Sequence, residues 1–140
     1  MEQKATASTK LVTGNFVVIQ GDINRRIGDG GASLWKKTFN TEGRYKGGAA
    51  ILMLMVKGLT ATESDAEVKI NGKSVGKIYS YEGANPKHWF TQIINIGAGI
   101  LKDGDNELEV EAVDLPNPSA GDLYNDFYIR DVVCFFQRED

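Results

Sequence analysis

Cysteine and histidine are almost absent from this chain of 140 residues, which contains one of each. The lone Cys134 cannot form an internal disulfide, and it lies beside Val133 and Phe135. We therefore interpret it as a buried thiol in a reducing compartment. The single His88 leaves little for a histidine-dependent catalytic triad, and we interpret it as a surface residue. These two shortages argue against an enzyme.

Basic residues are not in excess either, since 16 Lys and Arg stand against 19 Asp and Glu and give a net charge of −3. A nucleic-acid partner is therefore not expected. The longest apolar run, residues 49–56, is too short to span a bilayer. Residues 1–10 lack the apolar core of a secretory signal. We expect a cytoplasmic location, and a protein released without a signal or as part of a particle would look the same.

The chain has three prolines but sixteen glycines, a balance typical of many short strands joined by tight turns. Leu108, Val110 and Ala112 alternate with acidic residues, which predicts a strand with one buried face. Asn71-Gly72 predicts a hairpin turn, because both residues tolerate positive φ. Further strands are expected in residues 15–20, 33–39, 49–56, 66–81, 89–96 and 127–137, with loops at 22–32, 41–48, 82–88 and 114–126.

Two of these strands have unusual patterns. The segment 49–56 is apolar on both faces, so we expect a central strand that is covered by the second sheet on one side and by a loop or a partner on the other. The segment 127–137 changes its phase, which a β-bulge near Asp131 would explain. The sequence thus predicts an all-β sandwich of two antiparallel sheets, with a single domain over residues 14–140 and a flexible arm or edge strand over residues 1–13.

Two motifs of the chain occur in a known superfamily. Residues 68–76 read Val-Lys-Ile-Asn-Gly-Lys-Ser-Val-Gly, and residues 101–110 read Leu-Lys-Asp-Gly-Asp-Asn-Glu-Leu-Glu-Val. With the closing segment 126–132, they resemble the galactose-binding-like jelly-roll domains found beside many glycosidase catalytic domains. The resemblance covers residues 49–136 and implies a jelly-roll sandwich that binds sugars, cell surfaces or proteins. The motif residues themselves are turn and core positions, and fold does not settle function.

A non-catalytic, lectin-like carbohydrate-binding module is the leading interpretation. Aromatic rings stack on sugar faces while nearby amides and charged groups hydrogen-bond the hydroxyls. Both tryptophans, Trp35 and Trp89, are expected in the core. The predicted site instead combines residues from two loops, which are Tyr81, Asn85, His88, Tyr124, Asn125 and Asp126.

Carboxylates occur in pairs, yet we expect neither a glycosidase pair nor a metal centre. Asp122 and Asp126 lie in an acidic loop, and a small sandwich rarely forms the deep cleft that glycoside hydrolysis needs. Asp103 and Asp105 are weak candidates for a structural calcium ion, since calcium takes six to eight oxygen ligands and this turn offers few. No cofactor is expected.

The alternative interpretation is a structural subunit of a larger assembly that binds protein rather than sugar. The apolar segment 49–56 and the pair Phe135-Phe136 suggest more hydrophobic surface than one small sandwich can bury. A homo-oligomer or docking to a larger particle would cover it.

Overall fold

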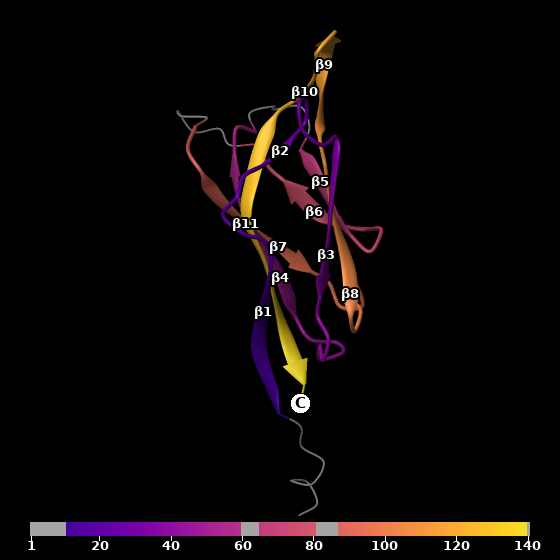
Figure 1. Cartoon of the computed structure of the whole chain (residues 1–140). Helices are drawn as coiled ribbons and strands as arrows, with labels where there is room; N and C mark the ends of the chain where they lie inside the picture. Colours follow the sequence, from indigo (N-terminus) through magenta and orange to yellow (C-terminus); the bar gives the residue numbers. More distant parts are fainter. Residues whose placement is uncertain (1–10, 60–64, 81–86, 140) are drawn as a thin grey trace, which may run out of the picture.

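The computed structural model describes residues 11–59, 65–80 and 87–139, and within them the regular structure is entirely β (Figure 1). The strands, in chain order, are β1 (Val12–Gln20), β2 (Arg25–Ile27), β3 (Leu34–Asn40), β4 (Ala50–Lys57), β5 (Ala66–Ile70), β6 (Lys73–Ile78), β7 (Phe90–Ile96), β8 (Asp105–Glu111), β9 (Val113–Ser119), β10 (Asp122–Asn125) and β11 (Phe127–Glu139).

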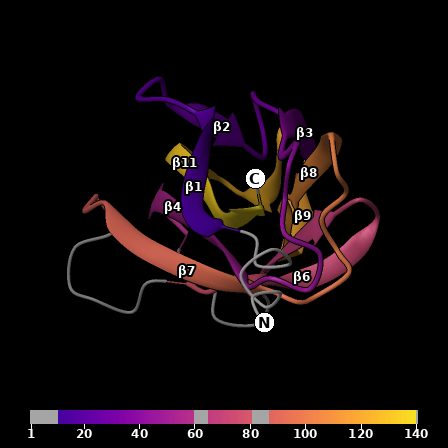
Figure 2. The ribbon, with the colours of Figure 1, turned by 90° about the horizontal axis from the view of Figure 1, so that it is seen from below.

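The strands form two facing sheets, and all strand pairings are antiparallel. The five-stranded sheet has the order β1-β11-β4-β7, with the short β2 also paired to β11. The four-stranded sheet has the order β3-β8-β5-β6, and β9 and β10 form a separate hairpin that projects at the top of Figure 1. The predicted jelly-roll β-sandwich is confirmed. Seen from below, β2 and β3 lie on one side of the sandwich and β7 and β6 on the other (Figure 2).

The core lies between the sheets and follows from alternation along the strands. In β4, Leu52, Leu54 and Val56 are fully buried while the residues between them are half-buried. They meet the buried alternating residues of β5 and β8 in the same core, such as Val68 and Val110. β4 lies between β11 and β7 in its sheet, so the prediction of an interior strand is confirmed.

Two predicted backbone features are present at the predicted residues. Asn71 and Gly72 both have positive φ, 54° and 81°, and join β5 to β6 in a tight turn. Asp131 has a φ of 51°, and the register between β11 and β4 shifts between Arg130 and Val133. This bulge restores the alternation that the sequence interrupts, so that Cys134 faces the core.

Two expected loops contain strands. β2 lies inside the segment 22–32, and the β9–β10 hairpin occupies most of the segment 114–126 and begins one residue before it, at Val113. The prolines Pro116 and Pro118 argue against a central strand, but β9 pairs only with β10 and tolerates missing backbone donors on its open side.

The N-terminal arm is described only from Leu11, and β1 from Val12 onward is an edge strand paired with β11. Residues 1–10 lie outside the described part, so the division between arm and domain stays a prediction. The described residues contain no helix that is long and apolar enough to cross a membrane.

Candidate functional site

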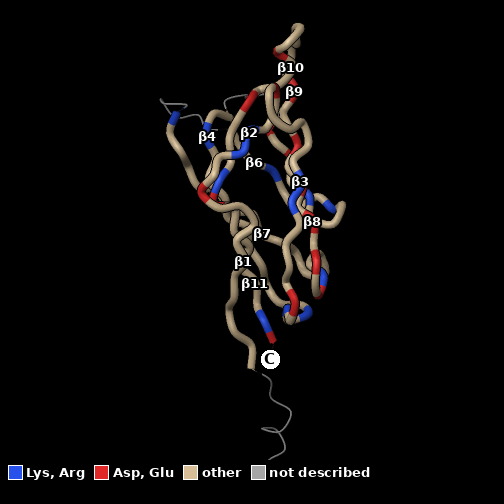
Figure 3. Tube along the Cα trace, in the orientation of Figure 1, with Lys and Arg blue, Asp and Glu red and all other residues tan. Residues whose placement is uncertain are grey.

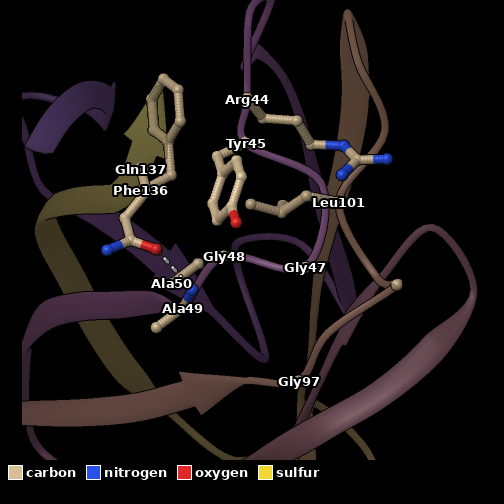
Figure 4. Close-up of a pocket in the computed structure, with 11 residues that line it drawn as sticks. Arg44, Tyr45, Gly47, Gly48, Ala49, Ala50, Gly97, Leu101, Phe136 and Gln137 are labelled. Atoms are coloured by element: carbon tan, nitrogen blue, oxygen red, sulfur yellow. Dashed lines mark hydrogen bonds between the residues drawn. The ribbon is translucent and has the colours of Figure 1, made fainter. Parts of the chain in front are cut away.

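Hollows on the described surface differ in size and chemistry. A small cavity beside Tyr45 and Gln137 has a volume of about 20 Å³ (Figure 4). This is space for a single water molecule rather than a ligand. A groove of about 470 Å³ is mainly apolar and lies over Phe16, Ile51 and Phe135. A groove of about 420 Å³ is mainly polar and lies at the side of the sandwich, by β2 and β3.

The polar groove collects side chains from both sheets. Its lining residues are Gln20, Asn24, Arg25, Arg26, Gly30, Gly31, Ala32, Trp35 and Lys37. Gln20 ends β1, the arginines belong to β2, and Trp35 and Lys37 belong to β3. Trp35 and Lys37 are two residues apart and therefore share the face of β3 that is turned toward the other sheet. Figure 3 shows basic segments on both β2 and β3.

Gln20 supplies a buried hydrogen-bond acceptor to this groove. Its side chain is 5% exposed, and its Nε2 donates to the carbonyl oxygen of Ile23 over 3.1 Å. Its Oε1 is buried and has no hydrogen-bond partner in the described part of the chain. A buried acceptor without a partner costs free energy, which a donor on a bound molecule would recover.

The cations of the groove differ in their partners. Arg26 Nη2 pairs with Asp126 Oδ2 over 2.8 Å, and this hydrogen bond raises the pKa of the Arg26 guanidinium. Arg25 and Lys37 are exposed, and neither has a carboxylate within ion-pairing distance in the described segments. The groove therefore offers two free cationic groups, one from each sheet.

The loop that walls the groove is held by backbone bonds and by two carboxylates. Ala32 N donates to Arg26 O and Gly28 N donates to Ala32 O, which closes the loop on itself. At Gly31 a Cβ would collide with the Arg26 carbonyl, so this tight approach requires glycine. The loop is also tied to the β10 region through Asp29, whose carboxylate accepts the N–H groups of Leu123 and Tyr124.

The residues predicted as a loop-borne sugar site have varied surroundings. Tyr81 and Asn85 lie outside the described residues. Asp126 has both oxygens engaged, because Oδ2 accepts from Arg26 and Oδ1 accepts from Asp29 N over 2.6 Å. Tyr124 and Asn125 are half-buried at the end of β10, and His88 is exposed just before β7. Tyr124 and Asp126 lie two residues apart at the junction of β10 and β11, whereas His88 belongs to the separate segment before β7.

One of the two tryptophan predictions is wrong. Trp35 is 9% exposed and belongs to the core, as expected. Trp89 is half-buried and is not a core residue. Its ring lies 4.2 Å from the Arg130 guanidinium and 5.0 Å from Lys57 Nζ, on the outer side of the five-stranded sheet. Cation–π attraction holds it there, and no residue near Trp89 in the sequence indicates these partners.

The motifs behind the superfamily resemblance form a structural hydrogen-bond network. Asn106 is 2% exposed; its Oδ1 accepts from Asn71 Nδ2 and Lys102 N, and its Nδ2 donates to Thr41 Oγ1 and Gly104 O. Asn71 Oδ1 in turn accepts from Glu107 N over 2.9 Å. The two asparagines therefore lock the β5–β6 turn onto the entry to β8 rather than forming a ligand site.

The weak calcium candidates Asp103 and Asp105 lie beside this network. Asp103 Oδ1 accepts from Gly43 N over 2.8 Å, and Asp105 Oδ1 accepts from Asn40 Nδ2 over 3.0 Å. Among the described residues no group of three or more His, Cys, Asp or Glu could hold a metal ion. Both aspartates thus serve as acceptors that hold the turn after β3.

The sequence did not single out the polar groove, although one signal was available. Lys37 occupies a core-facing position of β3 between Trp35 and Phe39, which is unusual for a lysine in a strand with one buried face. Gln20 and Arg25 carry no comparable signal, because their neighbourhood depends on how the two sheets pack.

Comparison with known proteins identifies the fold but no family. No family model and no curated protein matches the chain. Among solved structures, the chain is similar to BpGH86A, a beta-porphyranase of glycoside hydrolase family 86 from the human gut bacterium Bacteroides plebeius, with a TM-score of 0.63 at 15% identity over 94% of this chain and 22% of that one. It is also similar to BuGH86, solved in complex with neoagarooctaose, with a TM-score of 0.62 at 15% identity over 93% of this chain and 20% of that one.

A third similar structure is the CBM36-1 domain of a multidomain xylanase from the hindgut metagenome of Trinervitermes trinervoides. It has a TM-score of 0.48 at 16% identity, and the match covers 86% of this chain and 96% of that one. The chain spans only about a fifth of the length of each of the two glycoside hydrolase chains. At 15% identity, the similarity to these two glycoside hydrolase chains establishes the sandwich fold alone.

Proposed function

We propose that this chain is a non-catalytic carbohydrate-binding module and that the polar groove is its binding site. The observation that carries this proposal is the buried, unpartnered Oε1 of Gln20 beside the donor groups of Asn24, Arg25 and Lys37. A sugar hydroxyl both donates and accepts, so a site with one buried acceptor and several donors suits it. The groove volume of about 420 Å³ lies within the range of ligand pockets.

We propose a non-catalytic module because of the residues that line the groove. Its nine residues include no carboxylate, histidine, cysteine or serine. Glycoside hydrolysis in most families needs two carboxyl groups facing the scissile bond, and the groove offers none. The fold that this chain shares with part of two glycoside hydrolase chains is compatible with a binding role.

The loop-borne set Tyr81, Asn85, His88, Tyr124, Asn125 and Asp126 remains the rival location for a lectin-like site. Both oxygens of Asp126 already accept hydrogen bonds, which favours the groove over this loop. Tyr124 keeps a half-buried ring at the loop, so its removal tests the rival location directly.

A glycan array followed by calorimetry on the best-bound oligosaccharide tests the function. We expect Asn24→Ala with Lys37→Ala to abolish detectable binding, and Tyr124→Ala to leave it unchanged. Lys36→Ala is the matched control, because Lys36 is the neighbour of Lys37 on the opposite face of β3 and pairs with Glu109. Absence of binding to every glycan would remove the proposal, and loss of binding in Tyr124→Ala alone would move the site to the loop.

A second candidate function, a subunit of a protein assembly, is favoured by the outer face of the five-stranded sheet. Phe16, Val18 and Ile93 are 59%, 53% and 61% exposed there, and no described residue covers them. Such a face is a common site of protein association. Light scattering across a concentration series tests this function. A defined oligomer would support assembly if the double variant Phe16→Ser, Ile93→Ser is a monomer. A monomer at every concentration of the unchanged protein would argue against self-association.

A further inference from the structure

The charge of the polar groove indicates which class of sugar it would bind, an inference that rests on the proposed function. Arg25 and Lys37 reach it from opposite sheets, and neither has an acidic partner in the described part of the chain. Arg26 is balanced by Asp126. No carboxylate lines the groove. Two uncompensated positive charges thus face one hollow in a chain whose net charge is −3.

The two acidic groups that hold the loop beside the groove, Asp29 and Asp126, are already engaged elsewhere. The Asp126 carboxylate is shared between Arg26 and the backbone of Asp29, and the Asp29 carboxylate accepts from Leu123 and Tyr124. Asp22 is exposed in the turn after β1 and does not line the groove. The Asp29 and Asp126 carboxylates hold the groove wall in place, so these two are not free to turn toward Arg25 and Lys37.

We propose that the groove binds an anionic saccharide, with a sulfate ester or a carboxylate between Arg25 and Lys37 and a neighbouring hydroxyl donating to Gln20 Oε1. A guanidinium and an ammonium make charge-assisted hydrogen bonds to either anion, which neutral hydroxyls cannot match. Asn24 supplies a polar group to the same hollow, and Trp35 forms part of its apolar surface. The anion sets the preference and the hydroxyl contact sets the orientation of the ring.

Two pairs of probes distinguish the anion and its source. An oligogalacturonate is compared with its methyl ester, and a sulfated galactan oligosaccharide with its desulfated form, by calorimetry at 50 and 300 mM salt. We expect the charged member of at least one pair to bind at least about tenfold more tightly, as the loss of a charge-assisted hydrogen bond implies. The preference should shrink at the higher salt concentration, because both cations are exposed. The pair that shows it identifies carboxylate or sulfate.

Variants then assign the preference to the two cations. Arg25→Gln and Lys37→Gln should each reduce the affinity for the charged probe about tenfold, and each should reduce the affinity for the neutral probe by a smaller factor, because the glutamine amide still donates hydrogen bonds but carries no charge. Lys36→Gln, with the same charge change on the opposite face of β3, should change neither. All three positions are exposed, and unchanged melting temperatures would show that the variants fold.

The outcomes separate this inference from the function on which it rests. Equal binding of charged and neutral probes, with loss in Asn24→Ala, would overturn the anionic preference and keep a neutral sugar site. An equal loss in Lys36→Gln would also overturn it, because general surface charge would then explain the effect. Binding of no probe and no array glycan would overturn both proposals.

Discussion

The outer faces of the two sheets are opposites, although their inner faces share one core. On the four-stranded sheet, register places Lys36, Glu109 and Lys69 side by side in one charged row. On the five-stranded sheet, the equivalent rows are apolar except for Asn95 at the end of one of them. One row runs Phe16, Phe135, Ile51 and Asn95, and the next runs Val18, Val133, Met53 and Ile93.

This difference shows which surface is adapted to water. Cross-strand pairs of opposite charge are compatible with full solvation. A continuous surface of Val, Ile, Met and Phe side chains is unfavourable in water. On a monomer, exposed apolar residues are usually scattered singly and do not form such a continuous patch. The polar groove lies where the two kinds of sheet meet at their edges, which lets it combine a core tryptophan with free cations.

The largest expected contrast is in the reactivity of a cysteine at an inner and at an outer position of β11, which are positions 134 and 135. Burial raises the pKa of the Cys134 thiol to about 12 from the ordinary 9.0. A shift of this size lowers the thiolate fraction at neutral pH about a thousandfold, so Cys134 should not react with a thiol reagent in the folded protein. In a Cys134→Ala background, Phe135→Cys moves the thiol to the exposed face and should react readily under the same conditions.

The same shift gives a dependence of stability on pH with a definite sign. The unfolded thiol ionises near 9.0 and the folded thiol near 12, so the folded state holds more protons between these values. The free energy of unfolding should therefore fall as pH rises through this window, and less so in Cys134→Ala. Rapid modification of Cys134 at neutral pH, without unfolding, would contradict its burial.

Packing gives the next contrast, between neighbouring residues of β4. Leu54 is fully buried and Met53 is half-buried on the outer face. Leu54→Ala should lower the free energy of unfolding by about 2–5 kcal/mol, the usual cost of a core cavity. Met53→Ala should cost less than about 1 kcal/mol, because solvent already reaches the site. Urea unfolding measures both, and equal costs would show that the outer face is covered in solution.

The elements of the sandwich could be predicted where local sequence determines them. Alternation located β8, the Asn71-Gly72 turn located the β5–β6 hairpin, and the interrupted phase near Asp131 located the bulge in β11. β2 was missed because three residues, with Ile27 alone buried, carry too little pattern to be distinguished from a loop.

The polar groove could not be predicted, because its residues become neighbours only through long-range packing. Gln20 and Arg25 belong to one sheet and Lys37 to the other, and no spacing along the chain relates the three. Trp89 was misplaced for the same reason. Its position depends on Lys57 and Arg130, which the register of β4 with β11 brings close to it. Asn71 and Asn106, in contrast, were each recognisable as part of a turn motif, because each motif is a short local stretch of sequence. The hydrogen bond that joins the two asparagines links distant positions and was not predicted.

Salt dependence gives the smallest contrast and tests the charged row of the four-stranded sheet. Lys36 Nζ lies 3.8 Å from Glu109 Oε1, and the Lys36 side chain is about half exposed. The Glu109 side chain is only 17% exposed, so solvent reaches the pair from its Lys36 side. A surface pair of this kind contributes about 0.2–1 kcal/mol, so Lys36→Ala should cost no more than this at low salt. Because the Lys36 ammonium is accessible to salt ions, the cost should fall markedly near 1 M sodium chloride, where screening extends only about 3 Å. Val18→Ala on the apolar face serves as the control, and its effect on stability should not depend on salt. If the loss of stability in Lys36→Ala persists in high salt, the aliphatic part of the Lys36 side chain stabilises the sheet by packing rather than by charge.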